Sequence, residues 1–216
     1  MPTPVYLESG SKRVFACSLD WPGWCRSGKD ADAAVEALAA SADRYRAIAD
    51  GAGVRFPRNA AGAFDIVERL QGGGATDFGV PYEIPKADAR PLTRAQATRQ
   101  TNLVLAAWAA FDRVVAGAPE TLRKGPRGGG RDRDKILEHV VAAEASYARS
   151  MGIRMPAPDP NDRPGVTDLR DAIAGALRKP SDGKPLAAKG WPPRYAARRV
   201  AWHAIDHAWE IEDRTE

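Results

Sequence analysis

The stretch AWHAIDHAWEIE, residues 201–212, places two histidines four positions apart near the end of a chain of 216 residues. Positions i and i+4 lie on one face of an α-helix, so His203 and His207 are expected to project together. The apolar stripe continues at Ala196, Val200 and Ile211. Because an apolar stripe marks the buried face, the spacing predicts a final helix, starting after Pro192–Pro193, that carries both imidazoles inward.

The remaining histidine of the chain, His139, falls in a second helical pattern that runs from about Asp132 to Gly152. His139 stands beside Ile136 and Val140, at the margin of the apolar stripe of that helix. The three imidazoles are therefore expected to converge from two helices. Burying polar rings is costly unless their nitrogens are satisfied, so periodicity leaves two alternatives: a shared metal site, or core histidines that form hydrogen bonds.

Residues 93–216 read as helical throughout. Thr93 followed by Gln96 is a capping box, and the helix that it opens is expected to stop at Gly117. A third, shorter helical pattern covers residues 166–179, VTDLRDAIAGALRK. Four helices with apolar stripes predict a four-helix bundle over residues 93–216.

Residues 1–72 have a different pattern. PVYLESG and KRVFACSLD are short strand-like runs joined by a Gly-Ser hairpin signal, and AFDIVERLQG is another strand-like run. One helix is expected to start at the cap Asp30 and to end near Gly51. The predicted class is α+β: a small antiparallel sheet with one helix in residues 1–72, a Gly- and Pro-rich linker at 73–92, and the bundle.

Composition excludes several classes of protein. The net charge is only +4, so we expect no nucleic-acid partner. No window approaches about 20 uninterrupted apolar residues, so no membrane span is expected. The start of the chain, MPTPVYLESGSKR, has no secretory signal, and two cysteines are too few for a disulfide scaffold. A cytoplasmic protein is therefore expected.

Three histidines would suit a divalent transition metal, with Zn, Ni and Fe as candidates, since neutral imidazole is a good ligand for each of them. Three protein nitrogens leave coordination positions open, as in catalytic sites. Acidic side chains near the histidines in sequence are candidates to orient them: Glu144, Asp206 and Glu210. Asp206 is explained better as a partner of an arginine or lysine.

The segments ILEHVVAAE, residues 136–144, and HAIDHAWEI, residues 203–211, resemble the DinB/YfiT-like superfamily. The resemblance implies a four-helix bundle in which three histidines, here His139, His203 and His207, bind a divalent metal. It also implies thiol chemistry, because several relatives use mycothiol, bacillithiol or glutathione in S-transfer or isomerisation. The sequence departs from the family at residues 208–210, Ala-Trp-Glu, where many relatives have a small or basic pair and then Gln.

The first half is similar to the HicB-like antitoxin module in two places. Residues 20–23, Asp-Trp-Pro-Gly, match its turn, and residues 28–31, Gly-Lys-Asp-Ala, match the start of its helix. The resemblance implies a small sheet with one helix, and it does not imply antitoxin activity. The same turn has a structural explanation, because Pro and Gly fix tight turns while tryptophans pack a sheet.

The two cysteines and one basic loop are further candidate sites. Cys17 lies in an apolar strand-like run and is expected to be a buried small hydrophobe, whereas Cys25 lies in a loop and is expected to be more exposed. The basic loop at residues 122–134, LRKGPRGGGRDRD, fails the P-loop test and is expected to be a solvated connection. Its charges lead into the helix that carries His139, so an anionic substrate is an alternative.

These observations favour a metal-dependent thiol transferase or thiol-assisted isomerase that acts on a small-molecule substrate with a low-molecular-weight thiol, of which mycothiol is one candidate. A second hypothesis is a non-catalytic metal or ligand binder, or an antitoxin-like regulatory module. A third is a metal-free bundle with hydrogen-bonded histidines. The sequence leaves the oligomeric state open, with a homodimer as one possibility.

Overall fold

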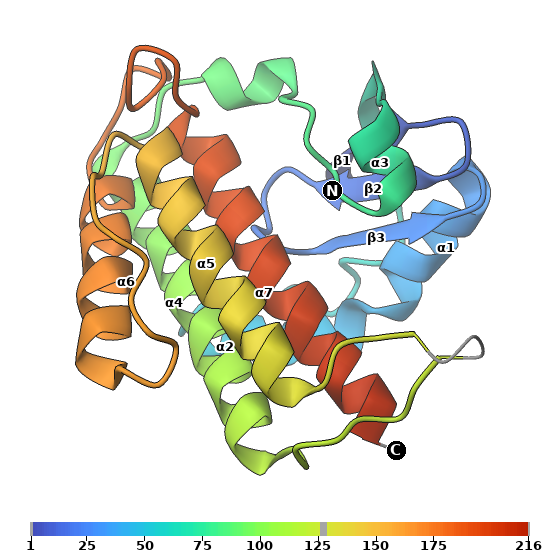
Figure 1. The fold of residues 1–216 in the computed structure, drawn as a ribbon. Helices are drawn as coiled ribbons and strands as arrows, with labels where there is room; N and C mark the ends of the chain where they lie inside the picture. Colours follow the sequence, from blue (N-terminus) through green and yellow to red (C-terminus); the bar gives the residue numbers. More distant parts are fainter. Residues whose placement is uncertain (1, 126–128, 216) are drawn as a thin grey trace.

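The structure is a computed structural model that describes residues 2–125 and 129–215. It is a mixed α/β fold, in which a four-stranded sheet lies beside a group of long helices (Figure 1). In chain order, the elements are β1 (Thr3–Ser9), β2 (Val14–Ser18), β3 (Cys25–Gly28), α1 (Ala31–Ala40), α2 (Ala42–Gly51), β4 (Phe64–Gln71), α3 (Gly74–Phe78), the 3-10 helix η1 (Lys86–Ala89), α4 (Arg94–Gly117), α5 (Arg133–Ser150), α6 (Arg163–Leu177) and α7 (Pro193–Thr215).

The sheet has the strand order β3-β2-β1-β4. The pairs β1–β2 and β2–β3 are antiparallel, which confirms the predicted hairpin. β4, however, pairs with β1 in parallel, so the prediction of an antiparallel sheet is wrong at this edge. The reason is the connection: the chain from β3 passes through α1 and α2 before it returns as β4, and such a helical crossover brings a strand back in the same direction.

The single helix expected from Asp30 to Gly51 is also wrong, because the structure has two helices that meet at Ser41. The side chain of Asp30 accepts a hydrogen bond from the backbone N–H of Ala33, so the predicted cap is confirmed. The hydroxyl of Ser41 donates to the carbonyl of Leu38 and lies 3.1 Å from Nε1 of Trp24, which donates to it. A serine side chain that hydrogen-bonds to a nearby backbone carbonyl competes with the hydrogen bonds of the helix. Here the buried Trp24 holds the Ser41 hydroxyl in this position.

The two faces of the sheet pack against different parts of the chain. Alternate residues of β1 and β2 contribute to one core beneath α1 and α2, and these are Val5, Leu7, Val14 and Ala16. The opposite face contributes Tyr6, Phe15, Cys17 and Cys25 to a second cluster that includes Trp202 of α7. The rings of Phe15 and Trp202 meet edge to face. The last helix therefore covers the sheet on one side and contacts the other long helices on the other.

The Gly- and Pro-rich segment at residues 73–92 is packed against both halves of the chain. Glu8 on β1 is buried and accepts hydrogen bonds from Thr76 Oγ1 and from the backbone N–H groups of Tyr82 and Glu83. Asp88 of η1 forms a buried ion pair with Arg198 of α7. The segment predicted as a linker thus holds β1 to α7 through polar contacts.

The helices α4, α5, α6 and α7 occupy the regions where the sequence predicts helices, and the Thr93 and Gln96 capping box is present at the start of α4. α4 packs against α6 and α7, and α5 packs against the same two helices. α2 of the first half also packs against α4, so the helical layer is not limited to residues 93–216. One hydrophobic core joins side chains of both halves, and the division into two domains stays a prediction.

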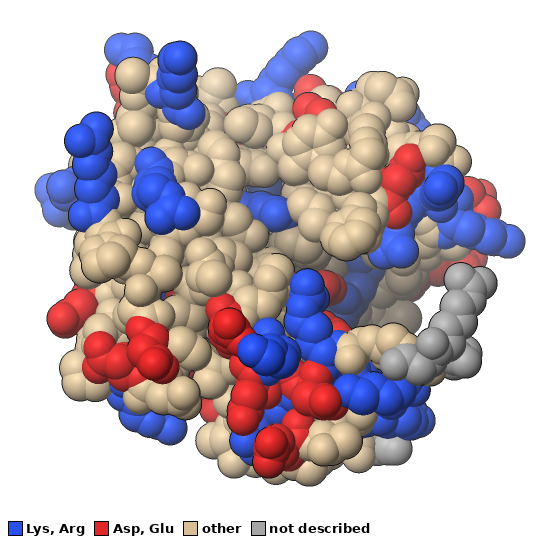
Figure 2. Space-filling model, viewed as in Figure 1, with Lys and Arg blue, Asp and Glu red and all other residues tan. Residues whose placement is uncertain are grey.

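None of the helices in residues 2–125 and 129–215 is long and apolar enough to span a membrane. Figure 2 shows the face on which α5 and α7 lie, and acidic and basic side chains are interspersed across it. Ion pairs join the first half of the chain to α7: Arg26 pairs with Asp206, and Arg44 pairs with Glu212 and with Asp213.

Candidate metal centre

Three imidazoles meet between α5 and α7. The candidate ligand nitrogens of His139, His203 and His207 all lie within 4.8 Å of one another. Nε2 of His203 is 3.2 Å from Nε2 of His139, and the ring centroids of His203 and His207 are 4.6 Å apart. Within the described residues these three form the one group of at least three His, Cys, Asp or Glu side chains placed to share an ion. The predicted convergence is therefore observed, and the metal-binding role stays a prediction.

Burial favours the neutral form of His139 and His203. His203 is 6% exposed, whereas His139 and His207 are partly exposed. Burial, followed by the charge of His207, lowers the pKa of His139 below its ordinary value, and the same two causes lower the pKa of His203 further. A neutral imidazole keeps a lone pair on one nitrogen, and that lone pair is what a metal ion requires.

His207 is oriented by a carboxylate on its own helix. Its Nδ1 lies 2.8 Å from Oε2 of Glu210, which leaves the lone pair of Nε2 free for a metal when Nδ1 carries the proton. Arg214 donates to the other carboxylate oxygen of Glu210 at 2.9 Å. Partial burial alone would raise the pKa of Glu210, but the bonds from His207 and Arg214 outweigh it and lower that pKa. Glu210 is therefore an ionised group that positions a candidate ligand.

The spacing of the two closest nitrogens fits binding to a single small metal ion. Two nitrogens bound to one tetrahedral zinc ion at about 2.0–2.1 Å are roughly 3.3 Å apart. The distance of 3.2 Å between Nε2 of His139 and Nε2 of His203 agrees with this value. A hydrogen bond between two rings would give the same distance, but it would not require the third imidazole close by. Nδ1 of His203 is also buried without a hydrogen-bond partner among the described residues.

His139 is reached from solvent on the side of α5. A surface pocket there is lined by the start of α5 and the residues before it, and His139 forms part of its wall. Two basic side chains, Arg131 and Lys135, lie in the same wall together with Glu138. Lys135 is paired with Glu138 at 2.6 Å, whereas Arg131 is exposed. The positive charge of Arg131 adds to the causes that lower the pKa values of His139 and His203.

The structure separates the three acidic candidates. Glu210 contacts His207, as the sequence suggested. Glu144 does not lie with the histidines, because it is 2% exposed and forms a bidentate pair with Arg170 of α6 at 2.9 and 3.1 Å. Five positions separate Glu144 from His139, which is a rotation of about 140° around the helix, so the two side chains leave α5 on different sides. Asp206 pairs with Arg26 at 3.0 Å, as a partner of an arginine was expected to do.

Both cysteines are buried, and the basic loop at residues 122–134 contains an ion pair. Cys17 is buried as predicted, but the expectation that Cys25 is more exposed is wrong, because Cys25 lies in β3 and is 5% exposed. The turn Trp21–Trp24 explains the difference, since it folds Cys25 back onto β2. In the basic loop, Lys124 pairs with Asp132, and residues 126–128 lie outside the described part of the chain.

Comparison of the chain with family models, with curated proteins and with solved structures gave no match. The resemblances to the DinB/YfiT-like superfamily and to the HicB-like module therefore stay predictions.

Proposed function

We propose that this chain binds one divalent transition metal through His139, His203 and His207 and uses it to activate a low-molecular-weight thiol. The observation that carries the proposal is the convergence of all three histidines of the chain on one point, with their candidate ligand nitrogens within 4.8 Å of one another. Zinc, nickel and iron remain the candidate metals, since all three accept imidazole nitrogen.

The surrounding residues support a reactive site. Three nitrogen ligands leave coordination positions free for a small molecule. A bound divalent metal would supply positive charge that favours the thiolate form of a thiol. Glu210 holds the ring of His207, and Arg131 places a positive charge at the mouth beside His139, where an anionic thiol or substrate would enter. The thiol itself is inferred from the DinB/YfiT-like resemblance, with S-transfer or thiol-assisted isomerisation as the reaction class.

The first test is metal content. Protein purified without a nickel column should hold close to one equivalent of metal, measured by inductively coupled plasma mass spectrometry, and the variants His139→Ala, His203→Ala and His207→Ala should each lose most of it. Asp206→Asn is a matched control on α7, because the carboxylate of Asp206 is paired with Arg26. Folded wild-type protein that binds no added zinc, nickel or iron would refute the metal site.

The second test separates an enzyme from a binder. The metal-loaded protein should consume mycothiol or glutathione in the presence of a model electrophile, and the histidine variants should not. Metal binding without any consumption of thiol would favour the non-catalytic metal or ligand binder instead. Metal bound at full stoichiometry in all three histidine variants would place the ion elsewhere in the chain.

A further inference from the structure

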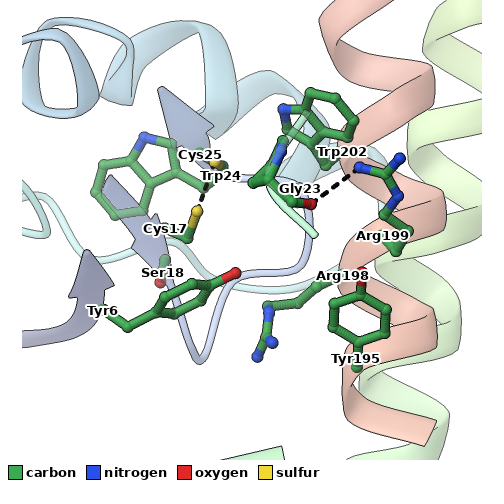
Figure 3. A pocket seen from close by; sticks show the side chains of 11 residues that line it. Tyr6, Cys17, Ser18, Gly23, Trp24, Cys25, Tyr195, Arg198, Arg199 and Trp202 are labelled. Carbon is green, nitrogen blue, oxygen red and sulfur yellow. Dashed lines mark hydrogen bonds between the residues drawn. The ribbon is translucent and has the colours of Figure 1, made fainter. Parts of the chain in front are cut away.

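The two cysteines of the chain face each other across neighbouring strands. Cys17 on β2 is the direct partner of Cys25 on β3, and the two sulfur atoms are in contact at 2.7 Å (Figure 3). The next pair along the ladder is hydrogen-bonded, because the N–H of Ser18 donates to the carbonyl of Trp24. Since bonded and non-bonded pairs alternate in an antiparallel ladder, the cysteines occupy a non-hydrogen-bonded pair, where side chains lie closest.

The surroundings favour sulfur–sulfur chemistry over metal binding. Both thiols are buried, with exposed fractions of 3% for Cys17 and 5% for Cys25. Among the described residues, neither belongs to a group of three or more metal-binding side chains. Two thiolates on one zinc ion would be held nearly 4 Å apart, since each Zn–S bond is about 2.3 Å, and the register here brings the side chains closer than that. Burial raises the pKa of the Cys25 thiol, so Cys25 is a neutral thiol when the pair is reduced.

A small cavity is lined by both cysteines. It has a volume of about 20 Å³, enough for one water-sized molecule, and lies between the sheet and α7 (Figure 3). Its walls include Tyr6, Arg199 and Trp202 in addition to the cysteines. A molecule the size of a glutathione has no room there, whereas a small oxidant can approach a sulfur atom.

We propose that Cys17 and Cys25 are a redox-active pair that hydrogen peroxide or a similarly small peroxide oxidises to a cross-strand disulfide. One thiol gives up its proton as its sulfur attacks an oxygen of the peroxide, the O–O bond breaks, and the released hydroxide takes up that proton, so a sulfenic acid and one water form. The sulfur of the second cysteine then attacks the sulfenic sulfur, the S–S bond forms, and the hydroxyl group leaves as water. In sum, two thiols are oxidised and one hydrogen peroxide is reduced to two molecules of water.

This site is independent of the three histidines. The cysteines face the sheet side of α7, where Trp202 packs, whereas the histidines lie between α7 and α5. The disulfide would fix the turn between β2 and β3, whose Gly23 lies against Ala201 and Ile205 of α7. Its formation needs no metal, so its test does not depend on the metal site.

The experiment uses the positions of the arginines. Trypsin cleaves after Arg13 and Arg26, so both cysteines fall in the single peptide Val14–Arg26. The folded protein is first treated with hydrogen peroxide. It is then denatured in the presence of iodoacetamide, which alkylates free thiols, digested with trypsin and analysed by mass spectrometry. We expect a peptide that carries no alkyl group and is lighter than the reduced peptide by two hydrogen atoms. Full alkylation of both cysteines, their separate oxidation to sulfinic acid, or a cross-link between two chains would each overturn the proposal.

Because the cysteines are close in sequence, a second measurement must show that the fold favours the bond. The disulfide is equilibrated with reduced and oxidised dithiothreitol, once in buffer and once in guanidinium chloride. A disulfide that stabilises the folded state must, by thermodynamic linkage, form more readily in that state. The equilibrium constant for disulfide formation should therefore be larger in the folded than in the unfolded protein, by a factor of about ten or more. An equal or smaller constant in the folded protein would contradict a pair that the structure has placed for oxidation.

Single variants provide the matched control. In Cys17→Ala and Cys25→Ala the remaining cysteine has no partner, so its sulfenic acid should persist and react with dimedone. The wild-type protein should give little of this adduct, because the second cysteine consumes the sulfenic acid. Equal dimedone labelling of the wild type and of the folded single variants would argue against the proposed second step.

Discussion

Nε2 of His203 lies 3.2 Å from Nε2 of His139, although 64 positions separate the two residues in the sequence. His207 completes the cluster one helical turn beyond His203, and its other nitrogen is held by Glu210. The three imidazoles join α5 to α7, and burying such polar rings costs free energy. Changes at these rings should therefore alter the measured stability of the protein.

The metal-free protein should lose stability as the pH falls below about 6.5. Burial lowers the folded-state pKa values of His139 and His203 below the ordinary value of 6.5. Between those lowered values and 6.5 the unfolded chain binds more protons than the folded one, so stability rises with pH in that window and is lost as the pH falls through it. Urea unfolding of the chelator-treated protein at pH 7.5 and pH 5.5 measures the effect. In His203→Gln the free energy of unfolding should differ less between the two pH values than in the wild type. An unchanged difference would contradict the role of His203 in the pH dependence.

Arg170→Ala should destabilise the protein strongly without removing the metal. The side chain of Arg170 is the bidentate partner of buried Glu144, and it also donates to Asp112. Removing one partner leaves an uncompensated buried charge, which costs about 3–5 kcal/mol. Urea unfolding should show this loss, while the metal content of the folded protein should stay at the wild-type value. The double variant Glu144→Leu, Arg170→Met should lose less stability, because it removes both charges together.

Gly23→Ala should weaken the contact between the β2–β3 turn and α7. Gly23 has φ of +90°, and a Cβ placed there would lie 2.5 Å from Cδ1 of Ile205. The strained backbone costs about 1–3 kcal/mol for a residue other than glycine. Ile205→Val removes the clashing atom but not the backbone strain, so Gly23→Ala should cost less in that background. A double-mutant cycle by urea unfolding gives the coupling, and strict additivity would refute the contact.

Arg131→Gln should weaken the use of an anionic thiol if the proposed function holds. Arg131 is exposed in the wall of the pocket that contains His139, so its charge attracts anions but is screened by water. Loss of one exposed charge should raise the KM for glutathione or mycothiol by about two- to fivefold, with kcat and metal content unchanged. Lys135→Gln is the matched control, because Lys135 is already paired with Glu138. A larger effect from the control than from Arg131→Gln would place the anion elsewhere.

Oxidation of Cys17 and Cys25 should raise the thermal stability of the folded chain. In the chain-entropy account, closing so short a loop removes freedom from the unfolded state worth about 2–3 kcal/mol. The unfolding midpoint of the peroxide-treated protein should therefore exceed that of the reduced protein, and dithiothreitol should reverse the shift. Cys17→Ala should show no such shift, and a lower midpoint after clean disulfide formation would mean that the bond distorts β2 and β3.

The sequence by itself determined the features that depend on local patterns. A period near 3.6 places His203 and His207 on one face of a helix, and the capping side chains Asp30 and Thr93 mark where helices begin. The Gly-Ser turn fixes the β1–β2 hairpin for the same reason, since neighbouring residues decide it. The prediction that His139 would meet the other two histidines relied on both helices having a buried face.

Only the tertiary structure decided which of these faces meet. β4 could not be recognised as parallel to β1, because its direction depends on the crossover through α1 and α2. Cys25 is buried by the turn that returns it to Cys17, and Glu144 is directed to Arg170 of another helix. A periodic pattern says which side of an element is buried, whereas the partner on that side depends on contacts between residues far apart in the chain, which no local spacing encodes.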